Sequence, residues 1–129
     1  MQPPVITEEM MPSLQGVIPA LIASCSAEGI PNVTYISQVF YVDQHHVALS
    51  RQFFNKTVRN VTENPVATVL VTCPINLFVY KLHLEFRESQ TEGEVFTNMR
   101  LQLEVIAGMQ GQSDNFKLMA ADIYSVKGI

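Results

Sequence analysis

Three cations, Arg51, Lys56 and Arg59, lie in a stretch of the chain, residues 44–62, that contains no acidic residue. They give this stretch a charge of +3, whereas the whole chain has 12 acidic residues against 8 basic ones and a formal net charge of −4. An acidic protein does not attract nucleic acid or an anionic membrane through its overall field. The sequence therefore predicts no nucleic-acid or membrane partner, and it confines anion binding to a local site in this stretch.

A short helix is expected to begin inside the same stretch. Asn55 is a residue type that caps helices, and apolar residues follow it three apart. The pair Asn64-Pro65 ends the pattern, because proline disfavours helical geometry in the residue before it. We therefore predict two turns of helix over residues 56–63.

The start of that helix has the chemistry of a phosphate site. The first N–H groups of a helix have no internal acceptors and lie at the positive end of its dipole. Lys56 adds a positive charge there, Thr57 adds a hydroxyl donor, and Arg51 offers a planar fork of donors at the end of the preceding strand. The same spacing also describes an ordinary helix cap followed by solvated cations, since so short a pattern is common. The spacing alone leaves both interpretations open.

The other chemically active residues form no catalytic motif. His45 and His46 are adjacent, so their side chains diverge and make a poor pair of metal ligands, and His83 lies on the polar face of an expected strand. Cys25 and Cys73 lack Cys-x-x-Cys spacing and sit among apolar residues, which indicates reduced, buried thiols in a cytoplasmic protein. Serine-hydrolase, Walker and Rossmann fingerprints are missing from the chain. We therefore predict no metal site and nominate no catalytic residue.

The hydrophobic pattern predicts a mainly β domain with inserted helices. With 129 residues, 47% of them hydrophobic, the chain fits a single domain over residues 1–129. Alternation of apolar and polar residues is clearest over residues 78–87, where Phe78 is the first expected core residue. About six strands are expected, over residues 17–24, 33–42, 47–50, 66–72, 78–87 and 123–126, with helices over 7–14, 56–63 and 94–107. The first three strands would form a meander, and the whole chain a small barrel.

The N-terminus and the mean hydropathy indicate whether the protein is exported and whether it forms a dimer. The N-terminus has no basic segment followed by an apolar one, and no apolar run reaches the roughly 18 residues of a membrane span, so we expect a soluble, unexported protein. The mean hydropathy of +0.15 implies more apolar strand surface than one small core covers. A homodimer is therefore expected.

The order of features resembles the pyridoxamine 5′-phosphate oxidase-like family of FMN-binding split barrels. The resemblance is best over residues 17–72, and the rest of the chain agrees in the order of its elements. The motifs that carry it are Gly29-x-Pro31-Asn32, Val42-Asp43, Val47-Ala48-Leu49-Ser50 and Asn55-Lys56-Thr57-x-x-Asn60-x-x-x-Asn64-Pro65. It implies a six-stranded split barrel that forms a homodimer with FMN at the subunit interface.

The resemblance also implies which residues contact the cofactor. Lys56 and Thr57 match the basic pair that binds the phosphate, with threonine as its second member, and Asn55 matches a position that is often serine. Lys81 falls about where the partner subunit contributes a polar contact. The remaining implied contacts are Tyr35, Ile36, Ser37 and Gln38 along the ring and ribityl chain, and Ser50 and Arg51 at the end of the third strand.

A flavin-dependent oxidoreductase with an unidentified small-molecule substrate is the function that this resemblance favours. The vitamin-forming oxidases have an Arg-x-His motif near the C-terminus, whereas this chain reads Lys127-Gly128-Ile129 there, so pyridoxamine phosphate oxidation is not expected. A flavin would carry the redox chemistry, which agrees with the missing acid, base and nucleophile signatures. The alternatives are a non-catalytic flavin-binding or sensory module, a deazaflavin protein, a haem protein with His45, His46 or His83 as ligand, and a ligand-free dimeric scaffold.

Overall fold

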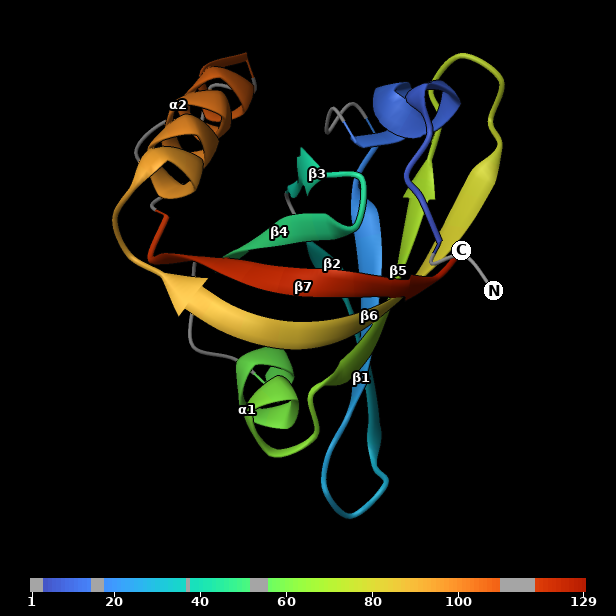
Figure 1. The fold of residues 1–129 in the computed structure, drawn as a ribbon, viewed down its shortest axis with the longest axis vertical. Coiled ribbons are helices and arrows are strands. Elements are labelled where there is room, and N and C mark those ends of the chain that lie inside the picture. Colours follow the sequence, from blue (N-terminus) through green and yellow to red (C-terminus); the bar gives the residue numbers. More distant parts are fainter. Residues whose placement is uncertain (1–3, 15–17, 37, 52–55, 110–117) are drawn as a thin grey trace.

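The computed structural model describes residues 4–14, 18–36, 38–51, 56–109 and 118–129, except for the side chains of 106–109. Seven strands among these residues form one antiparallel sheet (Figure 1). The elements in chain order are η1 (Glu8–Leu14), β1 (Ala20–Cys25), β2 (Pro31–Ile36), β3 (Val39–Asp43), β4 (His46–Arg51), α1 (Lys56–Glu63), β5 (Val66–Thr72), β6 (Val79–Gln90), α2 (Glu94–Met109) and β7 (Ala120–Gly128).

The sheet curls because its two edge strands are consecutive in the chain. The strand order is β2-β1-β5-β6-β7-β4-β3, so β2 and β3 lie at opposite edges. β2 ends at Ile36 and β3 begins at Val39, and three residue steps span at most about 10 Å. The two edges must therefore approach each other, which bends the sheet into a barrel that is split between β2 and β3.

The barrel interior holds the main hydrophobic core. Alternate residues of the strands point inward, and Ile22, Val69 and Leu82 are almost completely buried there. Tyr124 of β7 meets Phe86 of β6 edge to face, with their ring centroids 5.3 Å apart. Burial, helped by the negative charge of Asp122, raises the pKa of the Tyr124 hydroxyl well above its usual value, so this tyrosine is a neutral core residue.

The two α-helices lie at different places on the barrel (Figure 1). α2 buries Met99 against Ala48 of β4 and Ala121 of β7, which forms a second, smaller core outside the barrel. α1 contacts β1 and β2 and inserts Val61 into the main core. α1 is therefore held against the hairpin of the first two strands, next to the split in the sheet.

The mainly β architecture and several element boundaries agree with the sequence predictions. The helix expected over residues 56–63 is α1, with the same bounds, and α2 begins at Glu94 as predicted. The turn between β1 and β2 includes Gly29, whose φ of 87° is easily adopted only by glycine. No helix among the described residues has the length and apolar character that crossing a membrane requires.

The expected number and connection of strands were wrong in one place. Residues 33–42 do not form one strand of a meander, because β2 and β3 are separate strands that pair with β1 and β4 respectively. The stretch lacks a glycine or proline between the two strands, so the sequence carries no signal for the break. Phe78 was expected in the core but is 62% exposed, because β6 begins only at Val79.

Candidate functional site

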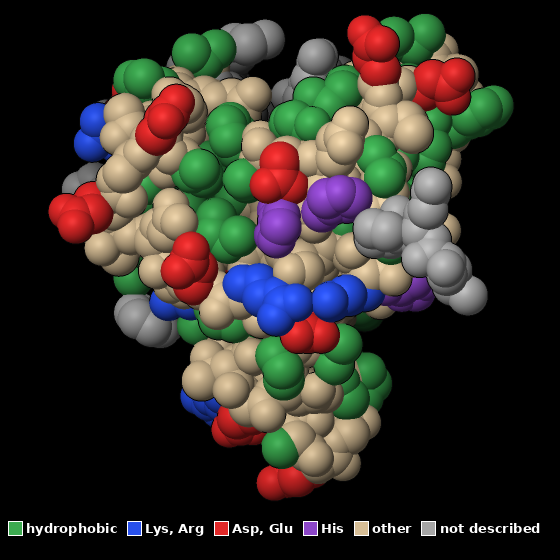
Figure 2. All heavy atoms as spheres, viewed as in Figure 1, with side chains coloured by type: hydrophobic (Ala, Val, Ile, Leu, Met, Phe, Trp, Pro, Cys, Tyr) green, Lys and Arg blue, Asp and Glu red, His purple; other side chains and the backbone are tan. Residues whose placement is uncertain are grey.

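The first turn of α1 lies at a cavity of about 330 Å³ between this helix and the β1–β2 hairpin. Lys56 and Arg59 of α1 line it together with Asn32 of β2. Glu28 and Glu63 line the same cavity, so the acid-free stretch of sequence meets two carboxylates in space. In Figure 2 both acidic and basic side chains are visible on the part of the surface that α1 and the hairpin form. The formal charges of the side chains that line the cavity therefore cancel, and both of its cations belong to α1.

Hydrogen bonds from asparagine side chains hold α1 on the hairpin. Asn32 Nδ2 donates to Thr57 Oγ1 over 3.3 Å, and Asn60 Nδ2 donates to Ser24 Oγ over 3.1 Å. Thr57 and Asn60 are buried, so these bonds satisfy polar groups that water reaches poorly. They fix the helix start relative to β2, which a site for a small anion requires.

The Asn32 contact also orients the Thr57 hydroxyl. This oxygen accepts a hydrogen bond from Asn32 Nδ2, so its own hydrogen must be donated to a different acceptor. Lys56 is exposed in the same turn and carries three further donors. The first turn of α1 therefore presents a hydroxyl and an ammonium group at the positive end of the helix dipole, which together suit an anion.

Gln38 and Ser50 form a second polar group of atoms, where β3 begins and β4 nears its end. Both residues are buried, and the Ser50 N–H donates to the Gln38 carbonyl over 3.4 Å. Gln38 Nε2 donates to Gln102 Oε1 of α2. Within the described part of the chain, Gln38 Oε1 and Ser50 Oγ have no hydrogen-bond partner. A buried polar atom without a partner costs about 1–3 kcal/mol, so a bound ligand that supplies one gains affinity.

Arg51, expected near the start of α1, has partners on β6 and β7 in the described part of the chain. Its Nη2 lies 3.0 Å from Asp122 Oδ1 of β7 and donates to Ser89 Oγ of β6 over 2.9 Å. Ser89 Oγ in turn donates to Asp122 Oδ1 over 2.6 Å. Because this pair is largely buried, the guanidinium of Arg51 is a structural link between β4, β6 and β7.

Tyr35 and Lys81 lie on the face of the sheet that points away from the barrel interior. The strand register aligns Tyr35 with Leu21, Leu70 and Lys81, and it aligns Val33 with Ala23, Thr68 and His83. We call these eight residues the outer face. α1 packs on the opposite side, since Asn60 contacts the inward Ser24. Ile36 alternates with Tyr35 and faces the α1 side, whereas Ser37 and Asn55 lie outside the described residues.

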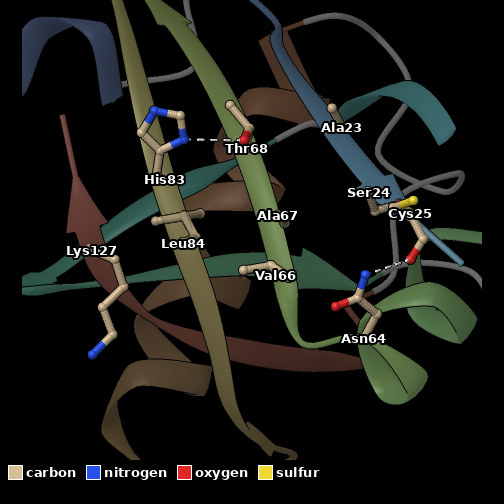
Figure 3. Close-up of a pocket in the computed structure, with 10 residues that line it drawn as sticks. All are labelled: Ala23, Ser24, Cys25, Asn64, Val66, Ala67, Thr68, His83, Leu84 and Lys127. Carbon is tan, nitrogen blue, oxygen red and sulfur yellow. Dashed lines mark hydrogen bonds between the residues drawn. The ribbon is translucent and has the colours of Figure 1, made fainter. Parts of the chain in front are cut away.

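A shallow cavity of about 310 Å³ lies over part of this outer face, and no pattern of residues along the chain indicated it (Figure 3). His83 Nδ1 lies 3.4 Å from Thr68 Oγ1 at one end, and Asn64 Nδ2 donates to the carbonyl of Cys25 over 3.5 Å at the other. Cys25 is a partly exposed free thiol, whereas Cys73 is a buried one as expected. The outer face therefore combines apolar residues with a few polar groups.

His45 and His46 lie in and beside the turn between β3 and β4. Asp43 Oδ1 is 2.8 Å from His46 Nδ1 and accepts the His45 N–H over 2.8 Å (Figure 2 shows histidine and acidic side chains together here). Burial raises the pKa of the Asp43 carboxyl, but these hydrogen bonds and the nearby histidine charges together outweigh it and hold that pKa below its usual value. Among the described residues, no three His, Cys, Asp or Glu side chains are grouped to hold a metal ion.

Two residues of the site had no role in the sequence analysis. Asn32 was part of a quoted motif, but nothing in the sequence linked it to Thr57, 25 residues away. Gln102 is separated from Gln38 by 64 residues and lies among ordinary helix-forming residues. Contacts of this kind depend on the tertiary fold, so local spacing carries no signal for them.

A protein-family comparison supports the resemblance inferred from the sequence. The family model described as pyridoxamine 5′-phosphate oxidase matches residues 6–118. An uncharacterized protein, MJ0282, from Methanocaldococcus jannaschii is 36% identical over 92 residues, which are 69% of this chain. The matched region spans 59% of the length of that relative.

Solved structures share the fold at low sequence identity. An FMN-binding protein from Syntrophomonas wolfei superposes with a TM-score of 0.73 at 18% identity, over 92% of this chain and 80% of that one. HutZ, the haem storage protein from Vibrio cholerae, superposes with a TM-score of 0.55 at 17% identity, over 94% of this chain and 88% of that one. Proteins of this fold therefore include ones named for a flavin and for haem. The chain belongs to the pyridoxamine 5′-phosphate oxidase family of split β-barrels.

Proposed function

We propose that this protein binds FMN, with the phosphate at the start of α1, and that it supports flavin redox chemistry. The observation that carries the proposal is the first turn of α1, where Lys56 lines the cavity and Asn32 orients the Thr57 hydroxyl at the positive end of the helix dipole. Helix N-termini of this kind favour phosphate through both hydrogen bonds and the helix dipole. Lys56 would add a direct ionic contact to the dianion.

The second end of the site fits the polar edge of a flavin ring. Gln38 Oε1 and Ser50 Oγ are buried polar atoms that have no partner within the described residues. They flank the beginning of β3 and the end of β4, and β4 leads through residues 52–55 to α1. A ligand with an anionic group at one end and a polar heterocycle at the other would serve both groups of residues.

When bound, FMN would supply the hydride or electron transfer, and the chain would supply position and electrostatics. Lys56 and Thr57 would hold the phosphate, and Gln38 and Ser50 would orient the ring edge. Arg51 would act indirectly, because its pair with Asp122 fixes the end of β4 from which Ser50 projects.

We further propose that two copies of the chain pair through the outer face. Val33 and Tyr35 are 65% and 73% exposed on the edge strand β2, and Leu21, Ala23 and Leu70 continue the apolar surface across β1 and β5. Contiguous apolar surface of this kind marks an interface. Lys81 lies on this face and away from the α1 of its own chain, so its ammonium group would lie at the interface between the two copies.

Titration of FMN with the purified protein tests the proposal. We expect quenching of flavin fluorescence with saturation at one FMN per chain, and unchanged fluorescence would contradict it. An absorption spectrum of the protein as purified distinguishes a flavin or deazaflavin from haem, because a Soret band is specific to haem. Stopped-flow reduction by NADH or NADPH with an added acceptor then separates an oxidoreductase, which turns over, from a flavin-binding sensor, which does not.

A further inference from the structure

The cavity over the outer face is not part of the proposed cofactor site. Its volume of about 310 Å³ is near the lower end of the range for small-molecule sites, about 300–1,000 Å³. Val66 and Ala67 lie in its middle, between the polar groups of His83 and Thr68 at one end and of Asn64 at the other (Figure 3). A shallow cavity with an apolar middle and polar ends suits a single amphipathic side chain.

Tyr35 is the largest side chain of the outer face, and it lies beside this cavity. It is 73% exposed on the edge strand β2 and is not among the residues that line the cavity of its own chain. The register places it two residues along the strands from the row that contains Ala23 and Thr68, a distance of about 7 Å. One surface therefore carries both an exposed aromatic ring and a cavity next to it.

A surface with both features is complementary to a second copy of itself. In a two-fold dimer the same patch faces itself, so each contact occurs twice with the roles of the two chains exchanged. Consider a two-fold axis that lies between the two faces, midway between Tyr35 and the cavity and perpendicular to the line that joins them. Such an axis brings the ring of each chain over the cavity of the other. Aromatic side chains in pockets of this kind supply much of the binding energy of an interface.

The charge of the cavity also fits a tyrosine side chain. Lys127 is the only Lys, Arg, Asp or Glu among the described residues that line it. The negative face of a tyrosine ring attracts an ammonium group. The tyrosine hydroxyl both donates and accepts hydrogen bonds, so it can bond to the polar groups at either end of the cavity. Ring and hydroxyl together therefore match the apolar middle, the charge and the polar ends.

We propose that Tyr35 of one copy occupies the outer-face cavity of the other, so that two identical contacts hold the homodimer together. This inference rests on the pairing of outer faces in the proposed function, and it names the contact on which that pairing depends. It assigns to the cavity a side chain of a second copy as its occupant, rather than a free ligand.

Two variants each remove one half of the contact. Tyr35→Ala removes the ring and leaves the cavity, whereas Ala23→Phe fills the cavity from β1 and leaves the ring. Each should raise the dissociation constant of the homodimer by about 30-fold, the effect of a residue that dominates an interface. Leu101→Ala, at a 51% exposed position on α2, is the control for loss of an exposed apolar side chain and should leave the constant unchanged. Sedimentation equilibrium measures this constant for the natural protein and for each variant.

A mixture of the two variants tests the contact itself. In the mixed dimer, Tyr35 of the Ala23→Phe chain enters the open cavity of the Tyr35→Ala chain. The second contact then has a filled cavity opposite an alanine, so nothing clashes there. The mixed dimer should therefore form more often than random pairing would give, and native mass spectrometry separates it from both homodimers by mass. Thr68→Phe fills the same cavity from β5 and replaces Ala23→Phe if that variant does not fold.

The outcomes distinguish this inference from the proposals on which it rests. If the natural protein is a dimer, then equal dimerisation by Tyr35→Ala, or mixed dimers no more frequent than random pairing gives, overturns this inference alone. A monomeric natural protein overturns the proposed pairing of outer faces and this inference with it. These measurements are made without added FMN, and the fluorescence titration tests the proposed cofactor site separately.

Discussion

Asn32 Nδ2 donates a hydrogen bond to Thr57 Oγ1 over 3.3 Å, and this contact joins the edge strand β2 to the first turn of α1. The contact matters for function because it orients the hydroxyl of Thr57 and fixes the helix start at the same time. Replacing Asn32 with alanine should lower the free energy of unfolding by about 1 kcal/mol, the contribution of one such hydrogen bond. It should also weaken FMN binding severalfold. Urea unfolding and a fluorescence titration of the same variant check both effects. An unchanged FMN affinity would show that Asn32 does not contribute to FMN binding.

Lys56 is expected to contribute to ligand binding but not to folding. Its side chain is exposed at the start of α1, so Lys56→Ala should leave the unfolding temperature nearly unchanged. Loss of a hydrogen bond to a charged group should weaken FMN binding by about 1.5–3 kcal/mol. Isothermal titration calorimetry gives the difference directly. Arg100→Ala, an exposed position on α2, removes the same charge elsewhere and should leave the affinity unchanged.

The proposed homodimer predicts different results for two valines of equal exposure. Val33 is 65% exposed on the outer face, and Val105 is 62% exposed on α2. Val33→Glu should give a monomer, because it introduces a charge into the apolar interface, whereas Val105→Glu should remain a dimer. Light scattering coupled to size-exclusion chromatography measures both masses. A monomeric natural protein, or a Val33→Glu variant that still dimerises, would argue against this surface as the interface.

The Arg51–Asp122 pair is expected to support stability. Asp122→Ala leaves the guanidinium of Arg51 largely buried beside Ser89, and loss of one partner of such a pair costs about 3 kcal/mol. The double variant Arg51→Met with Asp122→Leu removes both charges and should recover much of that loss. Chemical denaturation of the natural protein, of Asp122→Ala and of the double variant tests this order of stability. An Asp122→Ala protein as stable as the natural one would mean that the pair is not a structural link.

Asp43, which caps the turn between β3 and β4, should make a small contribution to the free energy of unfolding that depends on pH in the acidic range. Because the folded state lowers the pKa of Asp43, this carboxylate stabilises the fold above its ordinary pKa of about 4, and the contribution is lost as the pH falls below it. Asp43→Asn should therefore be less stable than the natural protein at pH 6, with the difference shrinking at about pH 3. Thermal unfolding at the two pH values measures it. An equal difference in unfolding temperature at both pH values would contradict a lowered pKa of Asp43 in the folded protein.

Local sequence patterns predicted the helix at whose start we propose that the flavin phosphate binds. The bounds of α1 follow from the apolar spacing after Asn55 and from Asn64-Pro65, and both signals act within one or two turns of chain. The same local logic missed the separation of β2 from β3, since Ile36 and Val39 belong to one continuous β-type run. Only the pairing of strands across the whole sheet shows where that run is divided.

The residues that we propose contact the flavin ring are positioned by contacts that local sequence patterns do not encode. Gln38 meets Gln102 across 64 residues, and Arg51 meets Asp122 across 71. The spacing along the chain predicted that Arg51 lies near Lys56, and it gave no signal for the buried carboxylate of Asp122 that its guanidinium meets on β7. Family resemblance pointed to Gln38 and Ser50, and each has a buried polar atom with no hydrogen-bond partner within the described ranges.

A crystal structure of the protein grown with FMN tests the central claim most directly. The account predicts the flavin phosphate within hydrogen-bond distance of the Lys56 ammonium and the Thr57 hydroxyl, at the first turn of α1. A flavin phosphate bound elsewhere on the barrel, with this helix start occupied only by water, would contradict it.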